Sequence, residues 1–135
     1  MPTLPLPDAL RDLLAKPNPA VVATLRRDGS PVTVATWYAL EGDRILLNMD
    51  NTRVRVQHLR RDPRVSVTVI DEADFYTHVS VVGRVEEWVE DEQLADIDRL
   101  SQRYTGRPYP VRDRPRVSAW VTIERWHGWG AGKSD

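Results

Sequence analysis

Apolar residues alternate with polar residues along much of the chain, and this pattern predicts β-strands. Val65, Val67 and Val69 illustrate it, because one polar side chain separates each valine from the next. Turn sequences rich in glycine, proline and aspartate, such as residues 28–31, separate the alternating runs at distances typical of hairpins. We therefore expect about six strands, over residues 20–25, 32–40, 45–49, 65–69, 75–89 and 117–126.

Three segments have helical periodicity instead. Residues 8–15 place three leucines on one face, and a second helix begins at Thr52, a natural N-cap, and stops before Pro63. A third helix follows Asp91, which we expect to cap it. Gly83 interrupts the longest strand and predicts a β-bulge or a sharp bend. Short hairpin turns favour antiparallel pairing, so the expected fold class is α+β with a barrel-like sheet.

The composition argues against several classes of function. The chain has 19 basic and 20 acidic residues, a formal net charge of −1, so no overall charge attracts it to nucleic acid or to a membrane. It has no cysteine, which excludes disulfides and thiolate nucleophiles. Its apolar runs are far shorter than the ~20 residues of a membrane helix, and no signal peptide is recognisable. We expect one cytoplasmic domain over residues 1–135, with disordered tails at 1–6 and 131–135.

Two arginines at the start of the second helix suggest an anion site. Arg53 and Arg55 fall at the positive end of the helix dipole, where cations are disfavoured by about 0.3–1 kcal/mol each. A bound phosphate would explain them, because free backbone N–H groups and guanidinium groups both donate to it. An exposed basic helix without a ligand is the alternative that the spacing leaves open.

Other side chains give little support to classical enzyme chemistry. The three histidines, His58, His78 and His127, lack metal-ligand spacing, so no metal site is expected. No Gly-x-Ser-x-Gly elbow occurs, and a site without a nucleophile suits a bound cofactor that carries the reaction. Trp126 and Trp129 fall at and just beyond the end of the last expected strand, where we expect them to pack on a partner subunit or a flat ligand.

With these elements in place, the chain resembles the pyridoxamine-phosphate-oxidase-like split barrels, and within them the deazaflavin (coenzyme F420)-dependent branch. The resemblance rests on the strand 20–25 before the turn at 28–31, the sequence Thr36-Trp37-Tyr38, the tract 51–64 and Gly83. It covers nearly the whole chain, from the first helix to about Trp129. It implies a six-stranded antiparallel split β-barrel that forms homodimers, with two cofactor sites at the interface.

The resemblance also implies roles for individual residues. Arg53 and Arg55 would hold the cofactor phosphate, and the residues flanking the phosphate and ribityl chain would be Asn48, Met49 and Thr52. Along the ring would lie Thr36 and Trp37, with Tyr76 and His78 coming from the partner subunit. Relatives often have lysine in place of Arg55 and asparagine in place of His58; an arginine preserves the charge at the phosphate.

The function implied is an oxidoreductase in which reduced coenzyme F420 delivers hydride to a small electron-poor substrate. Conjugated alkenes, quinones and linear tetrapyrroles such as biliverdin are candidate substrates, and Tyr38 and His78 are candidate proton donors, with solvent an equal alternative. An FMN-dependent oxidoreductase of the same fold and a non-catalytic cofactor-binding protein are the alternatives. The arginine-rich, lysine-poor composition favours the deazaflavin, because that branch is abundant in GC-rich genomes. A nucleic-acid role for the tract 53–64 is disfavoured by the near-neutral net charge.

Overall fold

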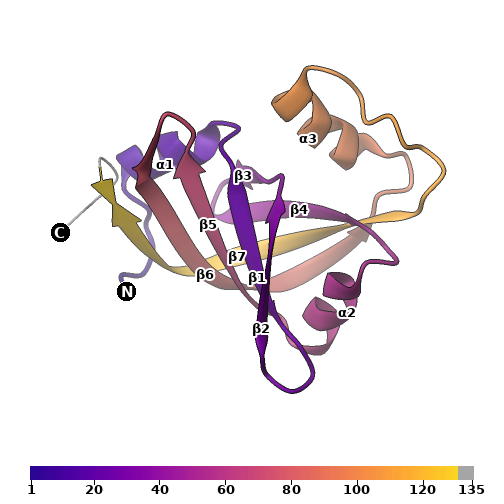
Figure 1. Ribbon diagram of the computed structural model, residues 1–135, viewed down its shortest axis with the longest axis horizontal. Helices are drawn as coiled ribbons and strands as arrows, with labels where there is room; N and C mark the ends of the chain where they lie inside the picture. Colours follow the sequence, from indigo (N-terminus) through magenta and orange to yellow (C-terminus); the bar gives the residue numbers. More distant parts are fainter. Residues whose placement is uncertain (131–135) are drawn as a thin grey trace.

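The computed structural model describes residues 1–130, in which seven strands form one antiparallel sheet (Figure 1). The strands are β1 (Ala20–Leu25), β2 (Pro31–Thr36), β3 (Ala39–Glu41), β4 (Arg44–Asp50), β5 (Arg64–Asp71), β6 (Asp74–Glu90) and β7 (Arg116–Trp129). Their order across the sheet is β2-β1-β5-β6-β7-β4-β3. Three helices accompany it: α1 (Asp8–Ala15), α2 (Val54–Arg61) and α3 (Ala95–Thr105). The expected α+β class is therefore confirmed.

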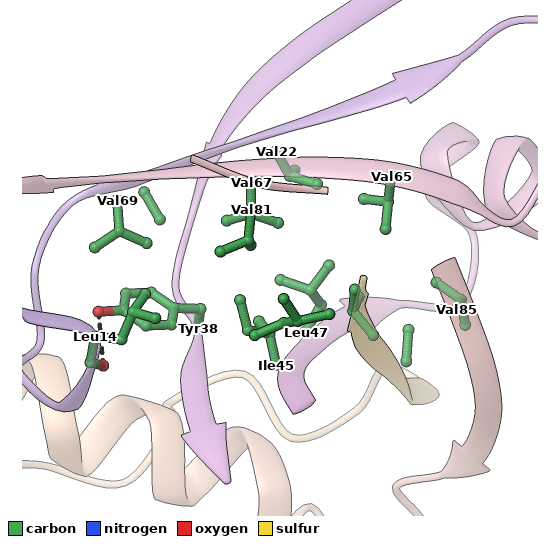
Figure 2. Close-up of a cluster of buried hydrophobic side chains, with 14 of the residues drawn as sticks. Leu14, Val22, Tyr38, Ile45, Leu47, Val65, Val67, Val69, Val81 and Val85 are labelled. Atoms are coloured by element: carbon green, nitrogen blue, oxygen red, sulfur yellow. Dashed lines mark hydrogen bonds between the residues drawn. The ribbon is translucent and has the colours of Figure 1, made fainter. Parts of the chain in front are cut away.

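The sheet curves around one main core. Val22 of β1 and Leu47 of β4 belong to the same buried cluster, although β5, β6 and β7 lie between their strands in the sheet. Such contact requires the sheet to curl until its two halves face each other, as in a partly open barrel. Figure 2 shows these side chains, together with valines of β5 and β6, converging on one interior. Leucines of α1 close that interior, as their helical spacing predicts.

One predicted strand is divided by Tyr38, which explains why there are seven strands and not six. β2 ends at Thr36 and β3 begins at Ala39, whereas a continuous strand over 32–40 was expected. The Tyr38 side chain is fully buried, and its hydroxyl donates to the Leu14 carbonyl oxygen at 2.9 Å (Figure 2). The Lys16 carbonyl oxygen is a second acceptor, at 2.8 Å. A buried hydroxyl requires such partners. The chain consequently leaves the ladder at this point.

β6 and β7 form the longest pairing in the fold, and it is bent where glycine was expected to bend it. The register shifts between Val82 and Gly83. A Cβ atom at Gly83 would overlap the backbone carbonyl of Thr122 on β7, so this crossing requires a residue without a side chain. The bulge predicted at Gly83 is thus confirmed.

The end of β7 corrects two sequence expectations. The strand continues to Trp129, so Trp126 and Trp129 lie within it. Trp126 is buried, its backbone N–H donates to the Pro2 carbonyl, and its indole N–H donates to the Thr3 carbonyl at 2.9 Å. Residues 1–6, expected to be a disordered tail, are therefore placed against β7, and Leu6 is buried in the core. The other expected tail, 131–135, lies outside the described residues.

The ends of α2 and α3 differ in detail from the expected caps. Arg53, and not Thr52, occupies the N-cap of α2; the Thr52 hydroxyl donates to the Asp50 carboxylate in the preceding turn. Asp91 does cap α3, but from three residues before its N-cap: its carboxylate accepts from the backbone N–H groups of Asp96 and Ile97. Within residues 1–130, no helix has the length and apolarity needed to span a membrane.

Candidate cofactor-binding site

A cavity of about 610 Å³ lies between α3 and the strands β2, β4 and β7. Four residues that the sequence assigned to cofactor binding contribute to it: Thr36, Trp37, Asn48 and Arg55. The rest of the lining comes from the start of β1, the end of β2, the β5–β6 turn, α3, the loop after α3 and the start of β7. The residues are Pro17, Pro19, Ala20, Ala35, Glu72, Ile97, Leu100, Tyr104, Tyr109 and Arg116.

Arg55 gives the cavity an unsatisfied cation. Its Nε is the only buried side-chain nitrogen or oxygen of residues 1–130 that lacks a hydrogen-bond partner. No carboxylate of the described chain pairs with Arg53, Arg55 or Arg116. Burial lowers the pKa of Arg55, and the charges of Arg53 and Arg116 lower it further. A buried polar atom of this kind usually has a partner, so the residues fit an anionic group bound here.

Aromatic rings also line the cavity. Trp37 and Tyr104 are stacked, with ring centroids 5.5 Å apart and planes inclined by 9°. Tyr109 meets Trp37 edge-on at 6.1 Å, and the Arg116 guanidinium lies 4.8 Å from the Tyr109 centroid. The cavity thus combines flat apolar surfaces with a cationic end, an arrangement that suits a planar ring system carrying a phosphate.

Comparison with known proteins agrees with this architecture. Residues 6–130 match the family model described as pyridoxamine 5'-phosphate oxidase. The chain belongs to this family. Its fold is accordingly the split barrel of the pyridoxamine 5'-phosphate oxidase family, as expected from the sequence. Membership in this family supports an oxidoreductase with a flavin-type cofactor.

Several solved structures resemble the chain over most of its length. A protein described as an F420 reductase is 29% identical, with a TM-score of 0.80, and the match covers 89% of this chain and 97% of that one. A conserved hypothetical protein from Mycobacterium tuberculosis is also 29% identical, with a TM-score of 0.75 and coverages of 96% and 87%. General Stress Protein 26 from Bacillus anthracis, at 17% identity, a TM-score of 0.69 and coverages of 90% and 92%, shares the fold. No curated protein matches the chain in sequence.

Three further residues predicted to bind the cofactor do not line the cavity. Met49 is buried in the main core, so its side chain does not line the cavity. Thr52 is exposed in the turn before α2, where its hydroxyl binds Asp50 and accepts from Arg114 at 3.1 Å. Arg53 is exposed and does not line the cavity, but its charge is close enough to lower the pKa of Arg55.

The two candidate proton donors are also outside the cavity. Tyr38 is fully buried with its hydroxyl bonded to the Leu14 carbonyl of α1, and burial raises its pKa further above the ordinary value; these contacts give the hydroxyl a structural role. His78 is half-buried on β6, and its Nδ1 lies 3.1 Å from the Tyr76 carbonyl. Tyr76 is exposed and stacks on Phe75 at 4.3 Å. Neither His78 nor Tyr76 lines the cavity of one chain.

Sequence reasoning did not find three residues of the site. Tyr104 was assigned to the apolar face of the third helix, and its ring does pack there while its hydroxyl donates to the Asn18 carbonyl. Tyr109 and Arg116 follow α3 in a segment rich in proline and arginine, where no periodicity indicates which side chains face inward. The signal available was the aromatic and cationic character of that loop.

Proposed function

We propose that this protein is an oxidoreductase that binds a phosphate-bearing deazaflavin, coenzyme F420, in the cavity beside Arg55. The unpartnered, buried Nε of Arg55 carries the proposal, because it marks where an anionic group would complete the site. The similarity to a protein described as an F420 reductase, which this chain matches over 97% of that protein, supports the deazaflavin in particular. FMN at the same site is the alternative, since flavin-type cofactors occur in the family.

Each wall of the cavity has a part in this proposal. Arg55 and Arg116 would hold the phosphate, and Arg53 would add attraction at longer range. The ring would lie along the wall made by Trp37, Tyr104 and Tyr109, which also excludes water. The bound cofactor supplies hydride, so the protein contributes binding, orientation and a dry environment. The substrate class we propose is a small electron-poor molecule: a conjugated alkene, a quinone or a linear tetrapyrrole such as biliverdin.

A homodimer is part of the same proposal. Phe75, Tyr76 and Trp129 are large apolar residues with exposed fractions of 68%, 63% and 44%. β6 begins at Asp74 and pairs His78 with Trp129, so these side chains gather at one end of the β6–β7 pair. A second copy of the chain would cover them and bring Tyr76 and His78 toward the partner's cavity. Sedimentation equilibrium should show a dimer at micromolar concentration; a monomer that binds cofactor normally would contradict it.

Parallel titrations test the cofactor. Apo-protein is titrated with coenzyme F420, with FMN and with their phosphate-free counterparts, the deazaflavin riboside and riboflavin, while tryptophan fluorescence is recorded. We expect F420 to bind more tightly than FMN, and each phosphate-bearing ligand to bind at least about tenfold more tightly than its counterpart. Tighter binding of FMN favours the alternative flavin. Binding of neither would contradict the proposed function, and binding without reduction of any acceptor would favour a non-catalytic cofactor-binding protein.

A further inference from the structure

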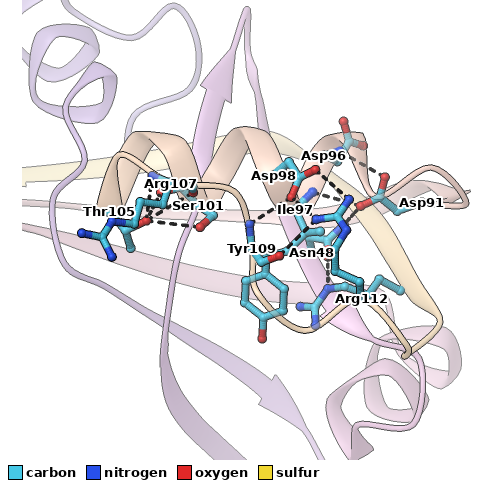
Figure 3. Close-up of polar contacts among 11 residues, drawn as sticks. Asn48, Asp91, Asp96, Ile97, Asp98, Ser101, Thr105, Arg107, Tyr109 and Arg112 are labelled. Atoms are coloured by element: carbon cyan, nitrogen blue, oxygen red, sulfur yellow. Dashed lines mark hydrogen bonds and ion pairs between the residues drawn. The ribbon is translucent and has the colours of Figure 1, made fainter.

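Arg116 lines the cavity, and a chain of buried polar side chains holds its guanidinium group. Its Nε donates to the Oδ1 of Asn48 at 2.7 Å. The Nδ2 of Asn48 donates to the Asp91 carboxylate and to the Ser118 hydroxyl, both at 3.0 Å. Asn48, Asp91 and Ser118 have exposed fractions of 6%, 6% and 0%. Figure 3 shows Asn48 lying beside Asp91 at the first turn of α3.

The neighbours of Asn48 allow its amide only one orientation. A guanidinium group can only donate hydrogen bonds, so it must face the amide oxygen. The Asp91 carboxylate already accepts from the backbone N–H groups of Asp96 and Ile97, and as an acceptor it must face the amide nitrogen. A rotation of the amide by 180° would place two donors together on one side and two acceptors on the other. The orientation of Asn48 therefore fixes where Arg116 can place its Nε.

Asn48 also keeps Arg116 from being neutralised. The segment after α3 contains three alternate arginines, and two of them pair with carboxylates: Arg112 with Asp98 at 2.8 Å, and Arg114 with Asp50 at 2.9 Å. Arg116 bonds to a neutral amide instead and has no ion pair within residues 1–130. Asp91 is close enough to orient the amide, but its carboxylate is occupied by α3 and by Asn48. The positive charge of Arg116 thus remains available to a ligand.

We propose that Asp91 and Asn48 are positioning residues that hold Arg116, uncompensated, against the anionic group of the ligand. The proposal rests on the proposed function for the identity of the ligand, a phosphate-bearing flavin or deazaflavin. Tyr109 restrains the guanidinium from its other side, at 4.8 Å. Arg55 of α2 and Arg116 of β7 then form a pair of cations. The Asn48 amide lies between Arg116 and the carboxylate of Asp91.

Asn48→Asp is the sharpest test, because it replaces the amide nitrogen by oxygen and places a carboxylate directly against Arg116. The new oxygen also faces the Asp91 carboxylate, so the melting temperature of the variant is measured alongside ligand binding. The measured quantity is the affinity for FMN divided by the affinity for riboflavin, and likewise for coenzyme F420 and its phosphate-free riboside. We expect this ratio to fall about tenfold or more in Asn48→Asp, because the new ion pair competes with the phosphate. Asp91→Asn should lower the ratio less, because it releases the amide but adds no competing charge.

A matched control separates positioning from folding. Asp43→Asn makes the same chemical change as Asp91→Asn, but in the turn between β3 and β4, where it breaks the Arg11–Asp43 pair at the end of β4 remote from Arg116. A merely structural role would lower the melting temperature and weaken phosphate-bearing and phosphate-free ligands equally, leaving the ratio unchanged in all three variants. That result in Asn48→Asp, with the wild type preferring the phosphate, overturns this inference alone. A wild type without any preference for the phosphate overturns the inference and the phosphate assignment of the proposed function together.

Discussion

Arg103 lies over the ring of Tyr38, with its guanidinium carbon 5.1 Å from the ring centroid, and donates through Nε to the Tyr38 carbonyl at 3.0 Å. Its other nitrogens donate to the carbonyls of Ala15 at 2.8 Å and Lys16 at 2.7 Å, at the end of α1. Arginine therefore satisfies carbonyl groups that a helix leaves without partners, and it ties α3 to α1 across the edge of the cavity.

Replacing Arg103 by lysine should destabilise the fold. A lysine cannot present the planar set of donors, so we expect a loss of about 1.5–3 kcal/mol in the free energy of unfolding, measured by urea denaturation. Ligand affinity should fall as well, because Tyr104 is on the same helix. Arg107→Lys, at an exposed position just after α3, is the control and should leave both quantities unchanged.

Arg55→Ala should separate binding from stability. Loss of a charged donor to the phosphate is expected to weaken F420 or FMN binding about ten- to a hundredfold. The apo-protein should be no less stable, because the substitution removes an unpartnered cation from the first turn of α2. Arg60→Ala, in the last turn of the same helix, removes a guanidinium that stacks on Trp88 at 4.3 Å and should leave affinity unchanged. Equal losses in both variants would point to a general effect of positive charge.

Substitutions of the two candidate proton donors, Tyr38 and His78, should affect different properties: stability at Tyr38 and the rate of turnover at His78. Tyr38→Phe keeps the ring and removes the hydroxyl bonded to Leu14 and Lys16, so stability should fall by about 0.5–1.5 kcal/mol while turnover survives. His78→Ala should slow single-turnover oxidation of the reduced cofactor only modestly, because the proposed cofactor supplies the hydride and solvent can supply the proton. A loss above about a thousandfold at His78, with unchanged cofactor affinity, would instead identify an obligatory general acid.

His58 should make the fold sensitive to mild acid. It is buried on α2, its Nδ1 lies 3.0 Å from the Thr24 hydroxyl, and burial, then Arg61 and Arg26, lower its pKa below the ordinary 6.5. The unfolded chain therefore takes up this proton first as the pH falls. Stability should be full above pH 6.5 and decline below it, until the pH passes the lower pKa of the folded state. His58→Asn should flatten this dependence between pH 7 and 5, measured by urea denaturation at each pH; an unchanged slope would assign it to other groups.

Gly83→Ala should destabilise the protein more than the addition of a single methyl group suggests. The added methyl group would overlap the Thr122 carbonyl, so β6 and β7 must move apart at the bulge. Overpacking of this kind costs about 1–3 kcal/mol. Glu86→Ala, at an exposed position of the same strand, is the control. Equal midpoints of thermal unfolding in the two variants would show that the crossing tolerates a side chain.

Local sequence patterns predict well those elements whose conformation depends on residues close to them in the sequence. α1 begins and ends as expected because its three leucines recur at helical spacing and two prolines follow it. Gly83 was identifiable because an isolated glycine within a long strand often marks a bulge or a close approach of another backbone. The division of the strand at Tyr38 was not predictable, because its cause is a pair of carbonyl groups about two dozen residues away on and after α1.

Half of the residues predicted to bind the cofactor line the cavity. The cationic start of α2 and the aromatic Trp37 carry local signals, and Arg55, Trp37, Thr36 and Asn48 do meet at the cavity. Met49 does not line the cavity; every residue of β4 after Arg44 is buried, so strand alternation did not reveal which face Met49 occupies. Arg116 and Tyr109 were not predicted as site residues, because the path of their loop depends on ion pairs with distant residues, such as Arg114 with Asp50.

The excursion that contains α3 leaves the sheet and returns to it at one point. Glu90 pairs with Val117, and the Asp91 N–H donates to the Arg116 carbonyl at 3.0 Å, so the intervening segment is an insert in a β-hairpin (Figure 1). That insert supplies Tyr104 and Tyr109, whereas Arg55 and Asn48 belong to α2 and the sheet. Exchanging residues 92–115 with those of another family member would therefore replace Tyr104 and Tyr109 in the aromatic wall while Arg55 and Asn48 stay in place. Because both ends of the insert lie side by side in the β6–β7 ladder, it is a single replaceable unit through which protein engineering could change what the cavity accepts.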